Sequence, residues 1–434
     1  MSHINKVIRD LKQSLLYISY YFPPIKSIAV KRNYYFAMGL KKYFKEVNIL
    51  TTSNKNILDN EKTNLDGLVI NPLFTFDYRT IISKLKKKKD THFSEDQKSG
   101  RLIKFLIRVN ESFPFNLLIG EGGLFYIIHG FIAGNKILKQ AESKIIFTSF
   151  RPFSNVFIGY LLKLKFSNVK WIVSFHDIPV EILRKNLILL YLQNRVWRKI
   201  LGKCDLAVTV SDGINGIIRD FYPNVVTILN GITPRISSNQ DCFKFRMVYT
   251  GSIYLGYRDP TLLFFCISEL ISNKTLEKEK IELIYAGKDK VTWKNMISSY
   301  NLNDISQEFD DLPLNDALKL QESAHLNILL TWASEDQKGI LTGKLFEYLG
   351  TGNLILTIIN GSMDEEIASL FEEIGCGKVV ASNDLTALDQ LKDFINVLYK
   401  DWKLGKPLPP YISKLDKYSW DCQVEKLADC IHYC

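Results

Sequence analysis

Cysteine and histidine are scarce in this sequence, and neither follows a metal-binding pattern. There are seven cysteines and six histidines among 434 residues, with no C-x-x-C, H-x-x-x-H or H-E-x-x-H spacing. An odd number of scattered cysteines argues against a disulfide framework and a structural zinc site, and favours a reducing compartment. We expect no metal of the zinc-hydrolase type.

Long apolar runs are also lacking. No stretch reaches the roughly 20 apolar residues that span a bilayer. The longest candidate, residues 113–132, is broken by Glu121, Gly122, Gly123 and His129. The first residues lack the basic start, apolar core and small-residue cleavage site of a secretory signal. We therefore expect a cytoplasmic protein with no spanning segment.

The composition is that of a large folded protein. Hydrophobic residues make up 46% and aromatic residues 12% of the chain, enough to bury sizeable cores. A chain of 434 residues is too long for one ordinary domain, and two to three are expected.

The net charge of +10 is unevenly distributed. Residues 1–235 carry 36 Lys and Arg against 17 Asp and Glu, whereas residues 236–434 carry 20 against 29. Part of the excess is concentrated in five lysines, namely Lys84, Lys86, Lys87, Lys88 and Lys89. They predict peripheral attachment to an anionic membrane surface, or else form an ordinary solvated loop. Nucleic acid is disfavoured, because aromatic residues are not interleaved with the basic ones.

Short apolar strands alternate with helical segments along the whole chain, which is typical of parallel α/β sheets covered on both faces. The predicted strands are 15–20, 47–52, 144–149, 170–175, 206–210, 225–229, 246–250, 282–287, 326–330 and 353–357. A polar segment from 235 to 244 interrupts the pattern and indicates a linker. The sequence thus predicts an N-terminal Rossmann-like domain at 1–235, a C-terminal one at 245–405, and residues 406–434 ending in a helix that packs back on the N-terminal domain.

One segment, residues 342–356, combines several signals of a nucleotide site. Its pattern predicts a loop, a helix, a left-handed stop at Gly350 and Gly352, and a buried strand. A helix start after a glycine-bearing loop binds phosphate readily. Lys344 supplies a cation there, and the Glu347 carboxylate could accept two hydrogen bonds from a ribose diol. The alternative is an amphipathic helix with a surface Lys/Glu pair.

Chemically useful residues also follow predicted strands, where ligands of doubly wound sheets bind. His176 and Asp177 follow the strand 170–175, and His176 could hydrogen-bond a sugar hydroxyl or form a capping pair with Asp177. Gly251 ends the strand 246–250. Arg258 could bind a diphosphate with two bonds or form a surface pair with Asp259, before Pro260 starts the next helix.

The order of these pieces resembles the retaining glycosyltransferases of family 4, which have two Rossmann-like domains facing an interdomain cleft (the GT-B fold). The resemblance covers nearly the whole chain. It is carried by the segments Tyr20-Tyr21-Phe22-Pro23-Pro24, His176-Asp177, Val210-Ser211, Asn230-Gly231, Tyr249-Thr250-Gly251, Lys344-Leu345-Phe346-Glu347-Tyr348-Leu349 and Tyr418-Ser419-Trp420.

The resemblance implies a role for each matching residue. Glu347 corresponds to the second glutamate of the E-x7-E motif, which contacts the donor ribose. The amides around Leu341 and Thr342, with Gly251, would face the donor, and Arg258 and Lys344 would neutralise its diphosphate. His176 would lie beside the transferred sugar, and the acceptor side would include Pro24, Lys26 and Asp177.

The sequence departs from the family pattern in three places. Ile25-Lys26-Ser27 replaces the glycine pair that follows the Pro-Pro loop, and Gly251-Ser252-Ile253 replaces Gly-Arg-Leu, which leaves Arg258 as the nearest cation. Gly339 stands where the first glutamate of E-x7-E belongs, so its contact with the sugar must come from Glu335 or Asp336, or be absent.

By this resemblance the protein is a glycosyltransferase that acts with retention of configuration and without a metal. The donor is a UDP- or GDP-sugar, and the acceptor is a saccharide or a lipid-diphosphate-linked saccharide in cell-surface polysaccharide assembly. Two alternatives remain: a sugar-nucleotide epimerase or hydrolase on the same fold, and an inactive transferase-like partner protein.

Overall fold

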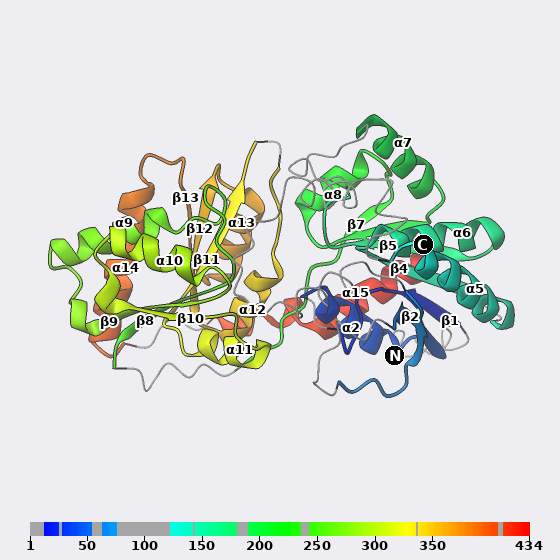
Figure 1. Ribbon diagram of the computed structural model, residues 1–434, viewed down its shortest axis with the longest axis horizontal. Helices are drawn as coiled ribbons and strands as arrows, with labels where there is room; N and C mark the ends of the chain where they lie inside the picture. Colours follow the sequence, from blue (N-terminus) through cyan, green and yellow to red (C-terminus); the bar gives the residue numbers. More distant parts are fainter. Residues whose placement is uncertain are drawn as a thin grey trace, which may run out of the picture. The chain divides into compact units, whose positions relative to one another are not determined.

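The computed structural model describes residues 13–25, 28–53, 63–75, 122–141, 144–179, 190–235, 243–335, 337–406 and 411–434. Lys26, Asp336 and the five lysines at 84–89 lie outside these ranges. The chain forms two compact units, Met1–Leu229 with Gln423–Cys434 (unit 1) and Asn230–Cys422 (unit 2) (Figure 1). Each unit is built around its own parallel sheet.

Unit 1 contains a seven-stranded sheet within the described residues, in the order β3-β2-β1-β4-β5-β6-β7. Its strands are apolar and buried on both faces at the centre of the sheet; Tyr17, for example, lies between Ile49 and Phe147 of the neighbouring strands. The strands are β1 (Ser14–Ile18), β2 (Glu46–Thr52), β3 (Val69–Leu73), β4 (Lys144–Phe150), β5 (Lys170–Phe175), β6 (Leu206–Thr209) and β7 (Val225–Thr227).

The helices of unit 1 pack closely where glycines permit it. A Cβ atom at Gly130 of α5 would lie 2.5 Å from the Ile158 side chain of α6, and one at Gly134 would lie 2.6 Å from the Leu162 side chain. The α6 side chains therefore pack directly on the backbone of α5. The described helices before the linker are α2 (Ile28–Leu40), α5 (Leu124–Gln140), α6 (Phe153–Lys165), α7 (Leu190–Leu201) and α8 (Asp212–Arg219). Ser211 caps α8, as its sequence context predicts, by accepting from the Ile214 amide at 3.3 Å.

The last helix, α15 (Trp420–Tyr433), brings the end of the chain to unit 1 (Figure 1). Val424 of α15 is buried against Gly39 of α2, where a Cβ atom would lie 2.5 Å from a valine methyl group.

Unit 2 contains a six-stranded parallel sheet in its described part, ordered β10-β9-β8-β11-β12-β13. Its strands are β8 (Phe245–Thr250), β9 (Ile281–Ala286), β10 (Ser306–Phe309), β11 (Leu326–Ala333), β12 (Leu354–Gly361) and β13 (Gly377–Ala381). Its α-helices before α15 are α9 (Thr261–Ser272), α10 (Lys290–Ser299), α11 (Leu314–Glu322), α12 (Gly343–Thr351), α13 (Glu365–Ile374) and α14 (Ala387–Lys403), with 3-10 turns at Lys278–Lys280, Asn303–Ile305, Ile412–Lys414 and Asp416–Tyr418.

The predicted fold class, two Rossmann-like α/β domains with parallel sheets, is confirmed. In both sheets the strand order reverses beside the first strand, between β1 and β4 and between β8 and β11. Ligands of doubly wound sheets bind at the carboxyl ends of the strands at this switch point. Both units therefore have a defined place for a site.

Two details at helix ends differ from the sequence prediction. Gly350 lies inside α12, where a Cβ atom would come within 2.6 Å of the Thr233 carbonyl oxygen, so close packing accounts for the glycine. Gly352, at φ 74°, is the left-handed C-cap. Pro260 is the N-cap of α9 rather than its first helical residue.

No helix in the described ranges is both long enough and apolar enough to cross a membrane.

Candidate functional site

Two glycines let the backbone after β8 approach both the backbone after β9 and the Lys344 side chain. Gly251 follows β8 with φ 148°, and a Cβ atom there would lie 3.2 Å from Lys344 Nζ. Gly287 follows β9, and a Cβ atom there would collide with the Gly251 carbonyl oxygen. Tyr285 Oη donates to that same oxygen at 3.0 Å. Glycine is therefore required at both positions to bring the backbone next to Lys344.

Lys344, in the first turn of α12, points its ammonium group at the end of β8. Its Nζ donates to the Thr250 carbonyl oxygen and, at 3.3 Å, to Thr250 Oγ1. Burial lowers the pKa of Lys344, the charge of Glu347 opposes this change, and the positive charge of Arg258 adds to it. An anion bound beside Lys344 and Arg258 would relieve this unfavourable environment.

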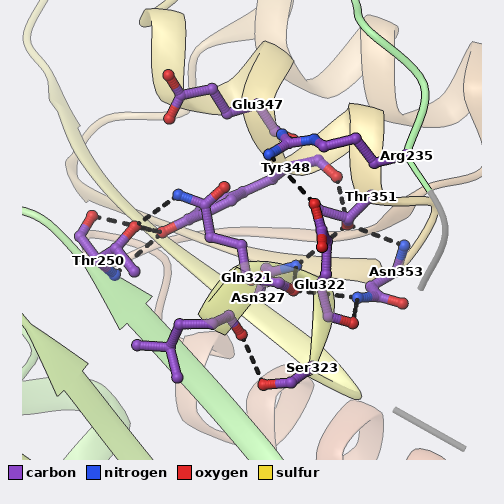
Figure 2. A network of polar contacts seen from close by, with 11 residues as sticks. Arg235, Thr250, Gln321, Glu322, Ser323, Asn327, Glu347, Tyr348, Thr351 and Asn353 are labelled. Atoms are coloured by element: carbon purple, nitrogen blue, oxygen red, sulfur yellow. Dashed lines mark hydrogen bonds and ion pairs between the residues drawn. The ribbon is translucent and has the colours of Figure 1, made fainter. Parts of the chain in front are cut away.

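A fully buried set of polar side chains fixes Thr250, the acceptor for Lys344 (Figure 2). Thr250 Oγ1 lies 3.1 Å from Tyr348 Oη and accepts from Gln321 Nε2 at 3.0 Å. The Thr250 amide donates to Tyr348 Oη at 3.2 Å. Lysine and the glutamine amide nitrogen are donors only, so Thr250 Oγ1 accepts from both, and either hydroxyl can be the donor between Thr250 and Tyr348.

The same network continues from Gln321 and joins α11, β11 and α12 (Figure 2). The Gln321 carbonyl oxygen accepts from Asn327 Nδ2 at 3.2 Å and from Asn353 Nδ2 at 3.1 Å. Thr351 Oγ1 donates to the Tyr348 carbonyl oxygen at 2.7 Å. These bonds use backbone and side-chain groups of three elements, so the position of Thr250 is set by the tertiary fold.

Glu347 lies one turn after Lys344. Its backbone carbonyl group is bound by Arg235, and its carboxylate takes no part in that contact. Arg235 Nη2 donates to the Glu347 carbonyl oxygen at 2.7 Å, Arg235 Nη1 lies 3.7 Å from Glu322 Oε1, and the Arg235 amide donates to Gly350 O at 2.7 Å. In Figure 2 the Glu347 carboxylate is directed away from this network. The carboxylate is half-buried and can accept hydrogen bonds from a ligand.

The loop before α12 is held by a buried aspartate. Asp364 caps α13 by accepting from the amides of Glu366 and Ile367 at 3.1 and 3.3 Å. Its other oxygen accepts from the Gly339 amide at 2.6 Å. Gly339 has φ 70°, a conformation that a glutamate would adopt only with strain. The local backbone thus explains why glycine occupies this position.

The end of this loop leads into the start of α12. Leu341 is buried, and Thr342 is the N-cap without a side-chain capping bond. Thr342 Oγ1 is buried and has no hydrogen-bond partner in the part of the chain that the structure describes. Together with the first amides of α12, it can donate to an anion. Glu335 lies in an exposed turn after β11.

Arg258 lies in the loop between β8 and α9. Its amide donates to the Tyr254 carbonyl oxygen at 2.7 Å, and its guanidinium carbon is 5.6 Å from the Tyr254 ring centroid. Asp259 directs its carboxylate at α9 and the loop, accepting from the Thr261 amide at 2.9 Å and the Gly256 amide at 3.0 Å.

In unit 1, His176 follows β5 and has one nitrogen engaged. Its Nε2 accepts from the Arg151 amide at 3.2 Å, so the proton of the neutral ring is on Nδ1. Burial, reinforced by the charges of Arg32 and Arg151, lowers the pKa of His176 to about 3. Nδ1 is buried and has no partner among the described residues. It can donate to a ligand hydroxyl.

Two other predicted residues of unit 1 lie in loops at strand ends. Asp177 forms an ion pair with Arg151 Nε at 2.9 Å and accepts from the Ile178 amide at 2.9 Å. This contact orients Arg151, whose amide contacts His176. Pro24 is exposed in the turn after β1.

Comparison with known proteins gives the fold its name. No protein-family model matches the sequence, and no curated protein matches it significantly. Solved structures do match over nearly the full length. A sucrose-phosphate synthase from Thermosynechococcus elongatus has a TM-score of 0.58 at 12% identity, covering 97% of this chain and 98% of that one. A lipopolysaccharide outer core galactosyltransferase, WaaB, has a TM-score of 0.59 at 10% identity, covering 97% and 99%. The pneumococcal O-GlcNAc transferase GtfA, in complex with UDP and GlcNAc, has a TM-score of 0.58 at 10% identity, also covering 97% and 99%.

The chain adopts the GT-B fold.

Within this GT-B protein, unit 2 brings together several of the predicted residues. Gly251 is beside Lys344, Arg258 is close enough for its charge to act on Lys344, and Glu347 is one helical turn away. His176, Asp177 and Pro24 belong to unit 1.

Sequence reasoning missed the residues that support the site, namely Arg151, Arg235, Gln321, Tyr348 and Asp364. Of these, only Tyr348 had a local signal, because it lies four residues after Lys344 on the same helix face.

Proposed function

We propose that this protein is a retaining glycosyltransferase of the family 4 type that transfers a sugar from a UDP- or GDP-sugar. The observation that carries the proposal is Lys344. Its ammonium is fixed on Thr250 at the switch point of the second sheet, at the start of α12, with Arg258 nearby and Glu347 one turn further on. This arrangement suits a nucleoside diphosphate.

In this proposal the diphosphate binds to Lys344, Arg258, Thr342 Oγ1 and the first amides of α12. Negative charge grows on the diphosphate as the glycosidic bond breaks, so groups that are already in place stabilise the transition state more than the ground state. Front-side attack by the acceptor hydroxyl then gives retention. Two cations and a helix N-terminus provide the neutralisation for which other enzymes use a metal.

Glu347 accepts hydrogen bonds from the donor ribose, and Gly251 leaves room for the diphosphate. His176 Nδ1–H donates to a hydroxyl of the transferred sugar or the acceptor, with Asp177 orienting Arg151 behind it. Because Gly339 replaces the first motif glutamate, recognition of the donor sugar passes to Glu335 or Asp336, on the loop after β11.

The proposed acceptor is a saccharide or a lipid-diphosphate-linked saccharide at the cytoplasmic face of a membrane, in cell-surface polysaccharide assembly. The basic excess of residues 1–235, 36 cationic against 17 anionic side chains, suits an acidic acceptor or surface. Pro24 and Lys26 belong to this acceptor side.

The deciding experiment is a binding screen of UDP- and GDP-sugars by native mass spectrometry, followed by turnover with and without saccharide acceptors. We expect one sugar-nucleotide to bind, Lys344→Met to abolish turnover, and product to form only when an acceptor is added. Donor consumption without acceptor would replace the proposal with an epimerase or hydrolase. Binding without any turnover would indicate an inactive partner protein, and no binding at all would overturn the nucleotide site.

A further inference from the structure

One face of α5 in unit 1 presents large apolar side chains to solvent. Leu124, Phe125, Ile128 and Ile132 are 46, 51, 45 and 59% exposed. They recur at helical spacing, opposite the face through which Tyr126, Ile127, Gly130, Gly134 and Leu138 are buried. The exposed stripe is therefore one side of an amphipathic helix whose other side already packs in the core.

The stripe extends onto the neighbouring loop. Phe74, after β3, is 58% exposed, and its ring centroid lies 6.1 Å from that of Phe125 and 5.9 Å from that of His129. We define the α5 apolar face as Phe74, Leu124, Phe125, Ile128 and Ile132. Exposed apolar side chains that gather on one face are a feature of interaction surfaces.

The charged side chains of α5 and of the adjacent α6 are all basic. Neither α5 nor the adjacent α6 contains an aspartate or glutamate. Lys136 and Lys139 lie toward the C-terminal end of α5, and Lys165 of α6 lies with its Nζ 5.5 Å from the ring centroid of Phe131 of α5. Leu164, beside Lys165, is 52% exposed. The matching partner is apolar where it meets the stripe and anionic beside it.

We propose that the α5 apolar face is the surface by which this protein lies on an anionic lipid bilayer. Helices with an apolar stripe and lysines beside it lie in the membrane plane, with the stripe at the boundary between headgroups and acyl chains. Lys136, Lys139 and Lys165 meet the lipid phosphates. The proposed function supplies only the reason for membrane binding, which is access to a lipid-linked acceptor. It does not depend on the five lysines at 84–89.

The test is sedimentation of the full chain with vesicles of phosphatidylcholine alone and of phosphatidylcholine mixed with phosphatidylglycerol. Wild-type protein is expected to bind the mixed vesicles and to lose binding in 1 M salt, where the Debye length is about 3 Å. The double variant Ile128→Gln/Ile132→Gln should lower the partition coefficient about tenfold, because each isoleucine has about half of its surface left to bury.

The matched control is Val397→Gln, an equally exposed residue (55%) on α14 of unit 2, which should leave vesicle binding unchanged. Lys136→Gln/Lys139→Gln should weaken binding to mixed vesicles only. Circular dichroism melts confirm that each variant is folded.

Three outcomes overturn the proposal: no binding by wild-type protein, equal binding by wild type and the isoleucine variant, or loss of binding only when the lysines at 84–89 become glutamine. Light scattering that shows a dimer converted to a monomer by the isoleucine variant, without vesicle binding, would assign the face to a second copy of the chain. Donor binding, measured without vesicles, tests the proposed function separately.

Discussion

The chemistry of Lys344 depends strongly on its surroundings. Burial lowers its pKa, and a bound diphosphate would raise it again. Nucleotide binding should therefore take up a proton when the pH is between the lowered pKa of the free protein and the higher pKa of the complex. Affinity should be greatest below the free-state pKa and should fall as the pH rises through it.

This dependence can be measured for UDP and GDP by titration calorimetry in buffers of different ionisation enthalpy. In Lys344→Arg, which stays charged throughout, the affinity should no longer change with pH in this range. For the wild-type protein, identical heats in all buffers at every pH tested would contradict proton uptake by Lys344.

Glu347 makes the second residue-scale prediction. Glu347→Ala should weaken nucleoside diphosphate binding by about 1.5–3 kcal/mol, the contribution of a hydrogen bond to a charged group. Glu372→Ala, which removes an exposed carboxylate on α13, should have no effect on binding. If the two folded variants bind nucleotide with equal affinity, Glu347 is not in the site.

At the scale of elements, the buried network between α11, β8 and α12 should position Lys344 rather than merely stabilise unit 2. Gln321→Met and Tyr348→Phe each remove a hydrogen bond to Thr250. We expect kcat to fall more than KM rises, and the pH midpoint of nucleotide binding to shift, because the acceptor of the Lys344 ammonium is no longer fixed.

Thr351→Val is the control for this prediction. Thr351 is as deeply buried and belongs to the same network, but its hydroxyl bonds to the Tyr348 carbonyl oxygen and not to Thr250. It should lower stability by about 1–3 kcal/mol and leave the pH midpoint unchanged. A shift of equal size in all three variants would reduce the network to a structural role.

The elements that the sequence predicted well are the central strands. β5 was predicted to the residue, because a buried strand in a parallel sheet is a continuous apolar run. The three strands that were missed, β3, β10 and β13, lie at sheet edges. Their sequences are short, and two of them contain proline or consist largely of polar residues. An edge strand pairs on one side only, so its sequence is less constrained.

The residues of the candidate site also fall into those that the sequence could predict and those that it could not. Gly251, Lys344 and Glu347 could be found because each lies next to a strand end or on a helix face that the pattern defines. Their supports could not, since Gln321 is 71 residues from Thr250 and Arg235 is 112 residues from Glu347. Such pairs depend on tertiary packing, which periodicity within a short window does not contain.

At the scale of the whole molecule, α15 should contribute to the stability of unit 1 and not to the nucleotide site. Val424→Ala removes two buried methyl groups from the contact with Gly39, at a cost of about 2 kcal/mol. In urea, unit 1 of the variant should unfold at a lower concentration than unit 1 of the wild type. The fluorescence of Trp171 and Trp197, both buried in unit 1, monitors this unfolding. Nucleotide affinity should be unchanged. A weaker nucleotide affinity in the folded variant would contradict this separation.

The return of the chain to unit 1 also determines the order in which the two units are completed during translation. The ribosome makes residues 230–422 before residues 423–434, so the emerging chain holds every residue of unit 2 while unit 1 still lacks Val424, Leu427 and Ile431, all buried in the finished protein. Unit 1 is therefore the first unit to emerge from the ribosome and the second to be complete. Until α15 emerges, the apolar surface of unit 1 that it covers is exposed to chaperones and to other nascent chains.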